Sequence, residues 1–115
     1  MAGADPKSVA TQYLSWTTGD LEATRAVVDD AMTFVGPLGV ANGIDECMAG
    51  LERMAGMVKA AHLHETFVAD ENVCIIYDLL VDGAPAVPTA GWYRVVNGKV
   101  VAARVFFDPR PLLPS

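Results

Sequence analysis

The chain has 115 residues, of which 52% are hydrophobic and 19% are charged, and its formal net charge is −6. This composition excludes a disordered chain and predicts one folded domain over residues 1–115 with a core of its own. The acidic balance argues against nucleic acid and anionic membranes as partners.

The sequence also limits where the protein is expected to reside. Its longest apolar runs are shorter than the roughly 20 residues that a membrane-spanning helix needs. No basic stretch followed by a hydrophobic one stands near Met1, so no signal peptide is visible. We therefore expect a cytoplasmic protein in which Cys47 and Cys74 are free, buried thiols, with a disulfide between them as the alternative.

Three helices are predicted in the first half of the chain. Asp5-Pro6 is typical of a helix start, because aspartate caps the free backbone N–H groups and proline suits the first helical position. Thr17-Thr18-Gly19 ends this helix, and Asp20 caps a second one that runs to Asp29-Asp30. A short strand over residues 31–35 follows, and a third helix begins after Asn42-Gly43.

Strands are predicted in the second half. They cover residues 62–69, 73–81, 89–96 and 99–108. Asn97-Gly98 is the strongest hairpin signal in the chain. Helices grouped before an antiparallel meander indicate an α+β fold, in which three N-terminal helices pack on a curved sheet and enclose a pocket.

Asp78 is the only charged residue in the segment 73–81, whose other eight residues are hydrophobic or aromatic. Such a run predicts a strand that is buried on both faces. A buried carboxylate that is neither paired nor hydrogen-bonded costs several kcal/mol, and sites of this kind often serve as an acid or base. We therefore predict that Asp78 acts as an acid or base in the pocket. The alternative is that Asp78 sits at a wet end of the strand or pairs with an arginine.

Three stretches resemble the nuclear-transport-factor-2-like superfamily, in its SnoaL-like branch. They are Tyr-Leu-Ser-Trp-Thr-Thr-Gly-Asp at 13–20, residues 33–39, and residues 91–108 through the Asn-Gly hairpin. The resemblance covers nearly the whole chain and implies a cone-shaped roll that holds a ligand and dimerises through the outer face of its sheet. Its members include ketosteroid isomerases, limonene-epoxide hydrolases, polyketide cyclases and non-catalytic association domains, so the fold alone does not imply one activity.

The resemblance carries over few residues of the ketosteroid isomerases. Gly36 stands where those enzymes have their general-base aspartate, and Gly91 stands where they have the aspartate of their oxyanion hole. Gln12, the neighbour of Tyr13, matches their first-helix tyrosine. Steroid isomerisation by that mechanism is therefore not expected.

The same holds for the epoxide hydrolases and polyketide cyclases. The acid that they carry in the final strand corresponds to Val105. Of the arginine and aspartate that the hydrolases place two residues apart on the central strand, only Asp78 remains, since Ile76 replaces the arginine. An epoxide opening that needs two carboxylates lacks one of them.

If Asp78 faces the pocket, the alternation along each strand determines its other neighbours. Tyr13 and Tyr93 are candidate donors to a ligand oxygen and complete the predicted catalytic set, although each is equally consistent with an ordinary core tyrosine. The predicted apolar lining is Trp16, Phe34, Met48, Met54, Met57, Cys74, Ile76, Leu80, Gly91, Ala103, Val105 and Phe107. The alternative is that the methionines and aromatics simply fill the core.

The opposite face of the sheet is expected to bind a second copy of the chain. Large aromatics beside arginines are typical of protein contacts, and the predicted dimer face comprises Trp92, Arg94, Arg104 and Phe106. His62 and His64 alternate on one strand and share a face, but no third ligand is evident in the sequence, so no metal is predicted.

These patterns together predict a protein that binds a small apolar metabolite without a metal or organic cofactor. The expected activity is isomerisation, cyclisation or hydrolysis with Asp78 as acid or base. The alternative is a non-catalytic ligand-binding or dimeric association domain that has lost the acids of its relatives.

Overall fold

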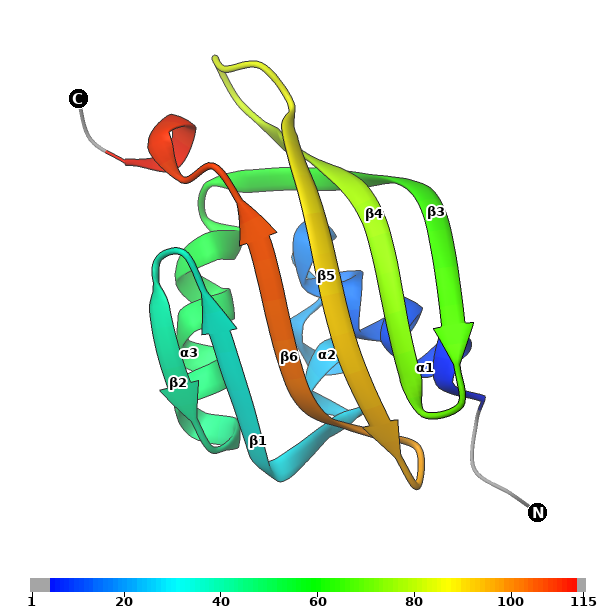
Figure 1. Ribbon diagram of the computed structural model, residues 1–115. Coiled ribbons are helices and arrows are strands. Elements are labelled where there is room, and N and C mark those ends of the chain that lie inside the picture. Colours follow the sequence, from blue (N-terminus) through cyan, green and yellow to red (C-terminus); the bar gives the residue numbers. More distant parts are fainter. Residues whose placement is uncertain (1–4, 114–115) are drawn as a thin grey trace.

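A six-stranded sheet in the order β2-β1-β6-β5-β4-β3 curves around the helices in the computed structural model, which describes residues 5–113 (Figure 1). The strands are β1 (Val28–Gly36), β2 (Gly39–Asn42), β3 (Val58–Ala69), β4 (Asn72–Val81), β5 (Val87–Val96) and β6 (Lys99–Phe107). The helices are α1 (Pro6–Tyr13), α2 (Leu21–Arg25) and α3 (Ile44–Ala55), with short 3-10 turns η1 (Leu14–Thr18) and η2 (Arg110–Leu112). None of the helices in the described part of the chain is long and apolar enough to cross a membrane.

The predicted α+β class, with three N-terminal helices on a curved sheet, is confirmed. The sheet is not purely antiparallel, however, because β1 pairs with β6 in parallel. This pairing continues the four-strand meander by two further strands. It places the β1–β2 hairpin beside α3, as Figure 1 shows.

The helix starts follow the capping residues that the sequence indicates. The carboxylate of Asp5 accepts a hydrogen bond from the backbone N–H of Ser8 at 3.0 Å, and that of Asp20 accepts one from Ala23 at 3.1 Å. The end of α2 differs from the prediction, since the helix stops at Arg25. The carbonyl of Val27 already accepts a hydrogen bond from the backbone N–H of Val100 in β6 at 2.7 Å. Pairing with β6 therefore replaces the next helical turn.

The two faces of β4 have opposite surroundings. Successive residues of β4 point to opposite faces of the sheet. The face turned toward the helices is buried and holds Val73, Ile75, Tyr77 and Leu79. The other face, here called the outer face, holds Cys74, Ile76, Asp78 and Leu80. The helices lie on one side of the sheet (Figure 1), and no described element covers the outer face. The prediction that the strand is buried on both faces is therefore wrong for the described chain.

Candidate functional site

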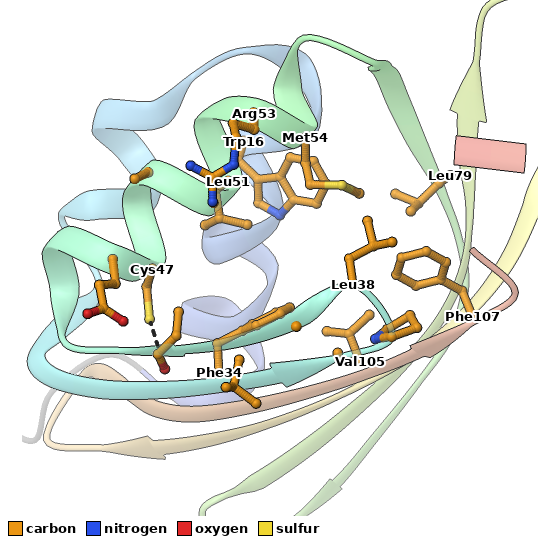
Figure 2. A pocket seen from close by; sticks show the side chains of 18 of the residues that line it. Trp16, Phe34, Leu38, Cys47, Leu51, Arg53, Met54, Leu79, Val105 and Phe107 are labelled. Carbon is orange, nitrogen blue, oxygen red and sulfur yellow. Dashed lines mark hydrogen bonds between the residues drawn. The ribbon is translucent and has the colours of Figure 1, made fainter. Parts of the chain in front are cut away.

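A cavity of about 540 Å³ opens between the inner face of the sheet, α3 and the β1–β2 hairpin (Figure 2). This volume lies in the range of sites that bind small molecules. In Figure 2, Leu51 and Met54 on α3 face Phe34 and Leu38 on the hairpin side. Most of the wall is apolar, as in sites that hold hydrophobic ligands.

All three tyrosines of the chain lie on the wall of this cavity. Tyr13 comes from α1, Tyr77 from β4 and Tyr93 from β5, and each side chain is at most 1% exposed. They mark the deep end of the cavity, because Leu38 and Met57 at the mouth are 46% and 41% exposed. These three residues are called the tyrosine cluster below.

The hydroxyl groups of the tyrosine cluster are unequally satisfied. Those of Tyr77 and Tyr93 lie 3.2 Å apart and share a hydrogen bond. The ring of Tyr13 packs against that of Tyr93 with centroids 5.3 Å apart, but its hydroxyl has no hydrogen-bond partner among the described residues. A buried hydroxyl without a partner costs about 1–3 kcal/mol, so it marks a position where a ligand oxygen would be stabilising.

Burial also fixes the protonation of these groups. It raises the pKa of Tyr77 to about 12, an increase partly offset by the hydrogen bond with Tyr93. Burial likewise raises the pKa of Tyr13 and of Tyr93, and the neighbouring Tyr77 raises both further. At neutral pH the tyrosine cluster therefore consists of neutral hydroxyls, which can donate hydrogen bonds to a ligand oxygen.

Gly91 makes room for this cluster. Gly91 and Tyr93 are two residues apart on β5 and face the same side, and the tyrosine side chain folds back over the glycine. A Cβ atom at position 91 would lie 2.2 Å from the hydroxyl oxygen of Tyr93. Any larger residue at position 91 therefore requires the Tyr93 side chain to move from its present position.

Further polar groups on the wall come from α3. The Glu46 carboxylate is exposed and accepts a hydrogen bond from the backbone N–H of Asn42 at 3.0 Å. The Cys47 thiol donates to the carbonyl of Met32 at 3.7 Å, and burial, followed by the charge of Glu46, raises its pKa. Of the described residues on the cavity wall, only Glu46 carries a carboxylate.

The structure brings many of the residues singled out from the sequence to the cavity wall. They are Tyr13, Trp16, Phe34, Met54, Met57, Tyr93, Val105 and Phe107. Met48, Gly91 and Ala103 are buried in the core beside it. The predicted dimer-face residues Trp92, Arg94, Arg104 and Phe106 alternate with the buried residues of β5 and β6 and so lie on the outer face.

The prediction that Asp78 faces the cavity is wrong, and with it the placement of Cys74, Ile76 and Leu80 in the lining. All four lie on the outer face. The Asp78 side chain is 26% exposed, and its carboxylate lies 2.8 Å from Nε2 of His64. It therefore cannot touch a ligand in the cavity. The physical reason is that β4 is apolar on both faces, so alternation alone did not tell which face the helices cover.

Several wall residues were not predicted. Tyr77 and Leu79 occupy the β4 positions that a one-residue shift of the predicted face would have selected. Leu38 reaches the cavity because Gly36-Pro37-Leu38-Gly39 turns the chain into β2. The sequence showed this turn, but the short strand after it carries no strong alternation.

Comparison with known proteins agrees with the fold. The SnoaL-like domain family matches residues 9–103. The chain belongs to this family. Its SnoaL-like domain shares the nuclear-transport-factor-2-like fold of solved structures, while no curated protein matches the chain.

Three solved structures illustrate the range of similar proteins. An NTF2-like protein of unknown function from Cytophaga hutchinsonii is 25% identical, with 94% of each chain covered and a TM-score of 0.80. An LEH-like epoxide hydrolase from M. tuberculosis is 19% identical, with 91% of this chain and 84% of that chain covered and a TM-score of 0.74. A hypothetical protein from Catenulispora acidiphila with a ketosteroid isomerase-like fold, in complex with trimethylamine, is 20% identical, with 87% and 85% covered and a TM-score of 0.72. At these identities the last two share the fold alone.

Proposed function

We propose that this SnoaL-like domain binds a small, largely apolar molecule that carries a carbonyl or similar acceptor oxygen. The observation that carries the proposal is the hydroxyl of Tyr13, a residue that lines the cavity: this hydroxyl is buried without a partner among the described residues. A carbonyl oxygen that accepts a hydrogen bond from this group offsets the cost of its burial. The surrounding apolar wall takes up the hydrocarbon part of the ligand.

A second candidate function is enolisation of the same ligand, as in an isomerase or cyclase. A hydrogen bond from Tyr13 stabilises negative charge that develops on a carbonyl oxygen, which is the role of an oxyanion hole. Glu46 favours this candidate because it places a carboxylate on the same wall, where it could accept a proton. The measurement is deuterium exchange at the carbon next to the carbonyl, by NMR. Exchange by wild type that is lost in Glu46→Gln supports enolisation with Glu46 as the base. Exchange by wild type no faster than in buffer alone contradicts enolisation, and equal catalysed exchange by wild type and Glu46→Gln contradicts the role of Glu46.

Ligand binding itself is tested with the fluorescence of Trp16. The chain has two tryptophans, so Trp92→Phe leaves Trp16 on the cavity wall as the single reporter. Cyclic ketones are titrated beside hydrocarbons of the same shape. We expect the ketones to bind about 2- to 10-fold more tightly, which corresponds to one net hydrogen bond. Equal affinities for both series would contradict a role of the Tyr13 hydroxyl.

A matched pair of variants locates the binding. Val105→Phe enlarges a side chain on the cavity wall, whereas Ile76→Phe adds an aromatic ring on the outer face. We expect Val105→Phe to weaken ketone binding and Ile76→Phe to leave it unchanged. Equal affinity in both variants and in the parent chain would place the binding outside the cavity.

We also propose that the outer face is the contact of a homodimer. This face carries large apolar groups, of which Phe67 and Phe106 are 59% and 61% exposed in the single chain. Arg104 on β6 and Glu65 on β3 lie near opposite edges of this apolar part of the outer face. Neither forms an ion pair among the described residues. Two copies related by a two-fold axis can therefore pair a basic edge with an acidic one while they bury the aromatics.

The dimer is tested by sedimentation at micromolar concentration. We expect a dimer for the wild type and a monomer for Phe106→Glu, because a carboxylate would have to be buried in the contact. Leu113→Glu, an equivalent change at an exposed leucine beyond the last strand, serves as the control and should remain dimeric. A monomeric wild type would contradict the proposal.

A further inference from the structure

Both histidines of the chain converge with Asp78 on the outer face, and these three residues are called the His–Asp cluster. The register of β3 and β4 places His62 directly opposite Asp78. Nε2 of His64 lies 2.8 Å from Oδ2 of Asp78, and the two imidazole rings lie 4.6 Å apart. One ligand atom from each residue lies within 4.8 Å of the others.

A bulge in β3 creates this convergence. Leu63 pairs with Tyr77 and Glu65 pairs with Ile76, so His64 is an extra residue without an opposite residue on β4. An extra residue bends the strand and re-aims its side chains. His64 is thereby turned toward the carboxylate that already faces His62.

The pairing of His64 with Asp78 does not by itself account for the cluster. Both side chains are partly exposed, at 43% and 26%, and even a fully charged surface pair contributes only about 0–1 kcal/mol to stability. It also leaves the second imidazole unexplained, since His62 lies beside His64 rather than pointing away from it. Two imidazoles and a carboxylate within reach of one point are instead the donor set of many transition-metal sites.

We propose that the His–Asp cluster binds a divalent transition metal of the Zn²⁺ type. Ligand atoms about 2.0 Å from a tetrahedral ion lie about 3.3 Å apart. The distance between Nε2 of His64 and Oδ2 of Asp78 therefore increases by about 0.5 Å when the ion binds, and the His62 ring moves toward the ion. An exposed side chain makes such a movement by rotation about its own bonds. Three protein ligands leave the fourth position to water or another small ligand.

The site is independent of the proposed ligand cavity. Asp78 and His64 lie on the outer face, whereas the cavity lies against the inner face of the same sheet. An ion in the His–Asp cluster therefore does not contact the cavity ligand. Since all three ligands come from one chain, the stoichiometry is one ion per chain in a monomer or a dimer.

The test uses Co²⁺ and Zn²⁺ with the full chain, freed of any affinity tag. Bound Co²⁺ in a site of low coordination number gives visible absorption, which Zn²⁺ then displaces. The chain has two histidines, so imidazole NMR reports on this cluster alone, and both rings should shift on addition of Zn²⁺. Loss of a residue that only supports a metal ligand weakens metal binding by about 10- to 100-fold. We expect His62→Ala, His64→Ala and Asp78→Asn each to weaken Zn²⁺ binding by at least as much, because each removes a ligand itself.

Two control variants complete the design. Asp82→Asn removes a carboxylate that pairs with Lys59 near the end of β4, and Cys74→Ala removes the thiol on the outer face. Both should bind Zn²⁺ as tightly as the wild type, and circular dichroism verifies that every variant folds. The proposal is overturned if Co²⁺ gives no visible absorption at millimolar concentration, or if the three cluster variants bind Zn²⁺ no more weakly than the controls.

Discussion

Replacing Tyr13 with phenylalanine should make the free protein more stable while it weakens binding of the ligand. The change removes one oxygen atom, which is buried without a partner among the described residues, and leaves the ring in place against Tyr93. Removing the penalty of about 1–3 kcal/mol for an unsatisfied hydroxyl outweighs the small void that remains. We expect a net gain of about 1 kcal/mol in the free energy of unfolding, or a rise in Tm of about 3–5 °C for a domain of this size.

The matched variant is Tyr77→Phe, which makes the same chemical change at a satisfied hydroxyl. It breaks the hydrogen bond to Tyr93 and leaves the Tyr93 hydroxyl buried without a partner. The lost bond and the new unsatisfied group together should destabilise the protein by about 2 kcal/mol. The two variants are therefore expected to shift the free energy of unfolding in opposite directions.

Urea denaturation and thermal unfolding of both variants measure the difference, and titration with a cyclic ketone measures binding. Tyr13→Phe should weaken the binding of the ketone by about 2- to 10-fold and leave the matching hydrocarbon unaffected. If Tyr13→Phe destabilises the protein as much as Tyr77→Phe does, the Tyr13 hydroxyl is already satisfied in the free protein. A ligand oxygen at this position would then find no unpaired hydroxyl to bind.

Three further predictions follow from the same geometry. Gly91→Ala should destabilise the protein by about 1–3 kcal/mol in urea denaturation, because the new Cβ overlaps the Tyr93 hydroxyl. Raising the pH from 10 to 12 should lower the free energy of unfolding, because the folded state keeps protons on tyrosines whose pKa values burial raises while the unfolded state releases them near pH 10. The slope approaches about 4 kcal/mol per pH unit for three such groups, and below about pH 11, where the folded state still keeps the Tyr77 proton, tyrosinate absorbance should appear only together with unfolding. Asp78→Asn should leave ketone affinity unchanged in the Trp16 fluorescence titration, since Asp78 lies on the outer face.

Local signals in the sequence predicted the parts of the fold that depend on local chemistry. Asp5 and Asp20 cap the helices at the positions indicated, because a capping carboxylate acts within three residues. Asn97-Gly98 forms the turn between β5 and β6, where both residues have a positive φ. These features require no knowledge of distant parts of the chain.

Features that depend on partners far along the chain were not predictable in the same way. The parallel pairing of β1 with β6 joins segments about seventy residues apart. No pattern in residues 31–35 indicates which strand pairs with them. The face of β4 was misassigned because Ile76 and Leu80 on the outer face are as apolar as Ile75 and Leu79 on the inner one. The tyrosine cluster was predicted only in part: Tyr13 and Tyr93 were named, whereas Tyr77 lies on the face of β4 that was assigned to the outside.

The third member of the His–Asp cluster was missed for a related reason. Spacing along one strand identified His62 and His64, whereas Asp78 joins them across the ladder. Cross-strand neighbours depend on register, and here the register shifts at the bulge. Such a shift leaves no distinct pattern in the residues themselves.

The back-folded Tyr93 limits how this cavity could change in evolution. An aspartate at position 91, where the resemblance places an acid of the ketosteroid isomerases, cannot coexist with the present orientation of Tyr93. A lineage that acquires the acid must therefore reorient or replace the tyrosine. The two residues thus form an epistatic pair, because the effect of a side chain at position 91 depends on the residue at position 93.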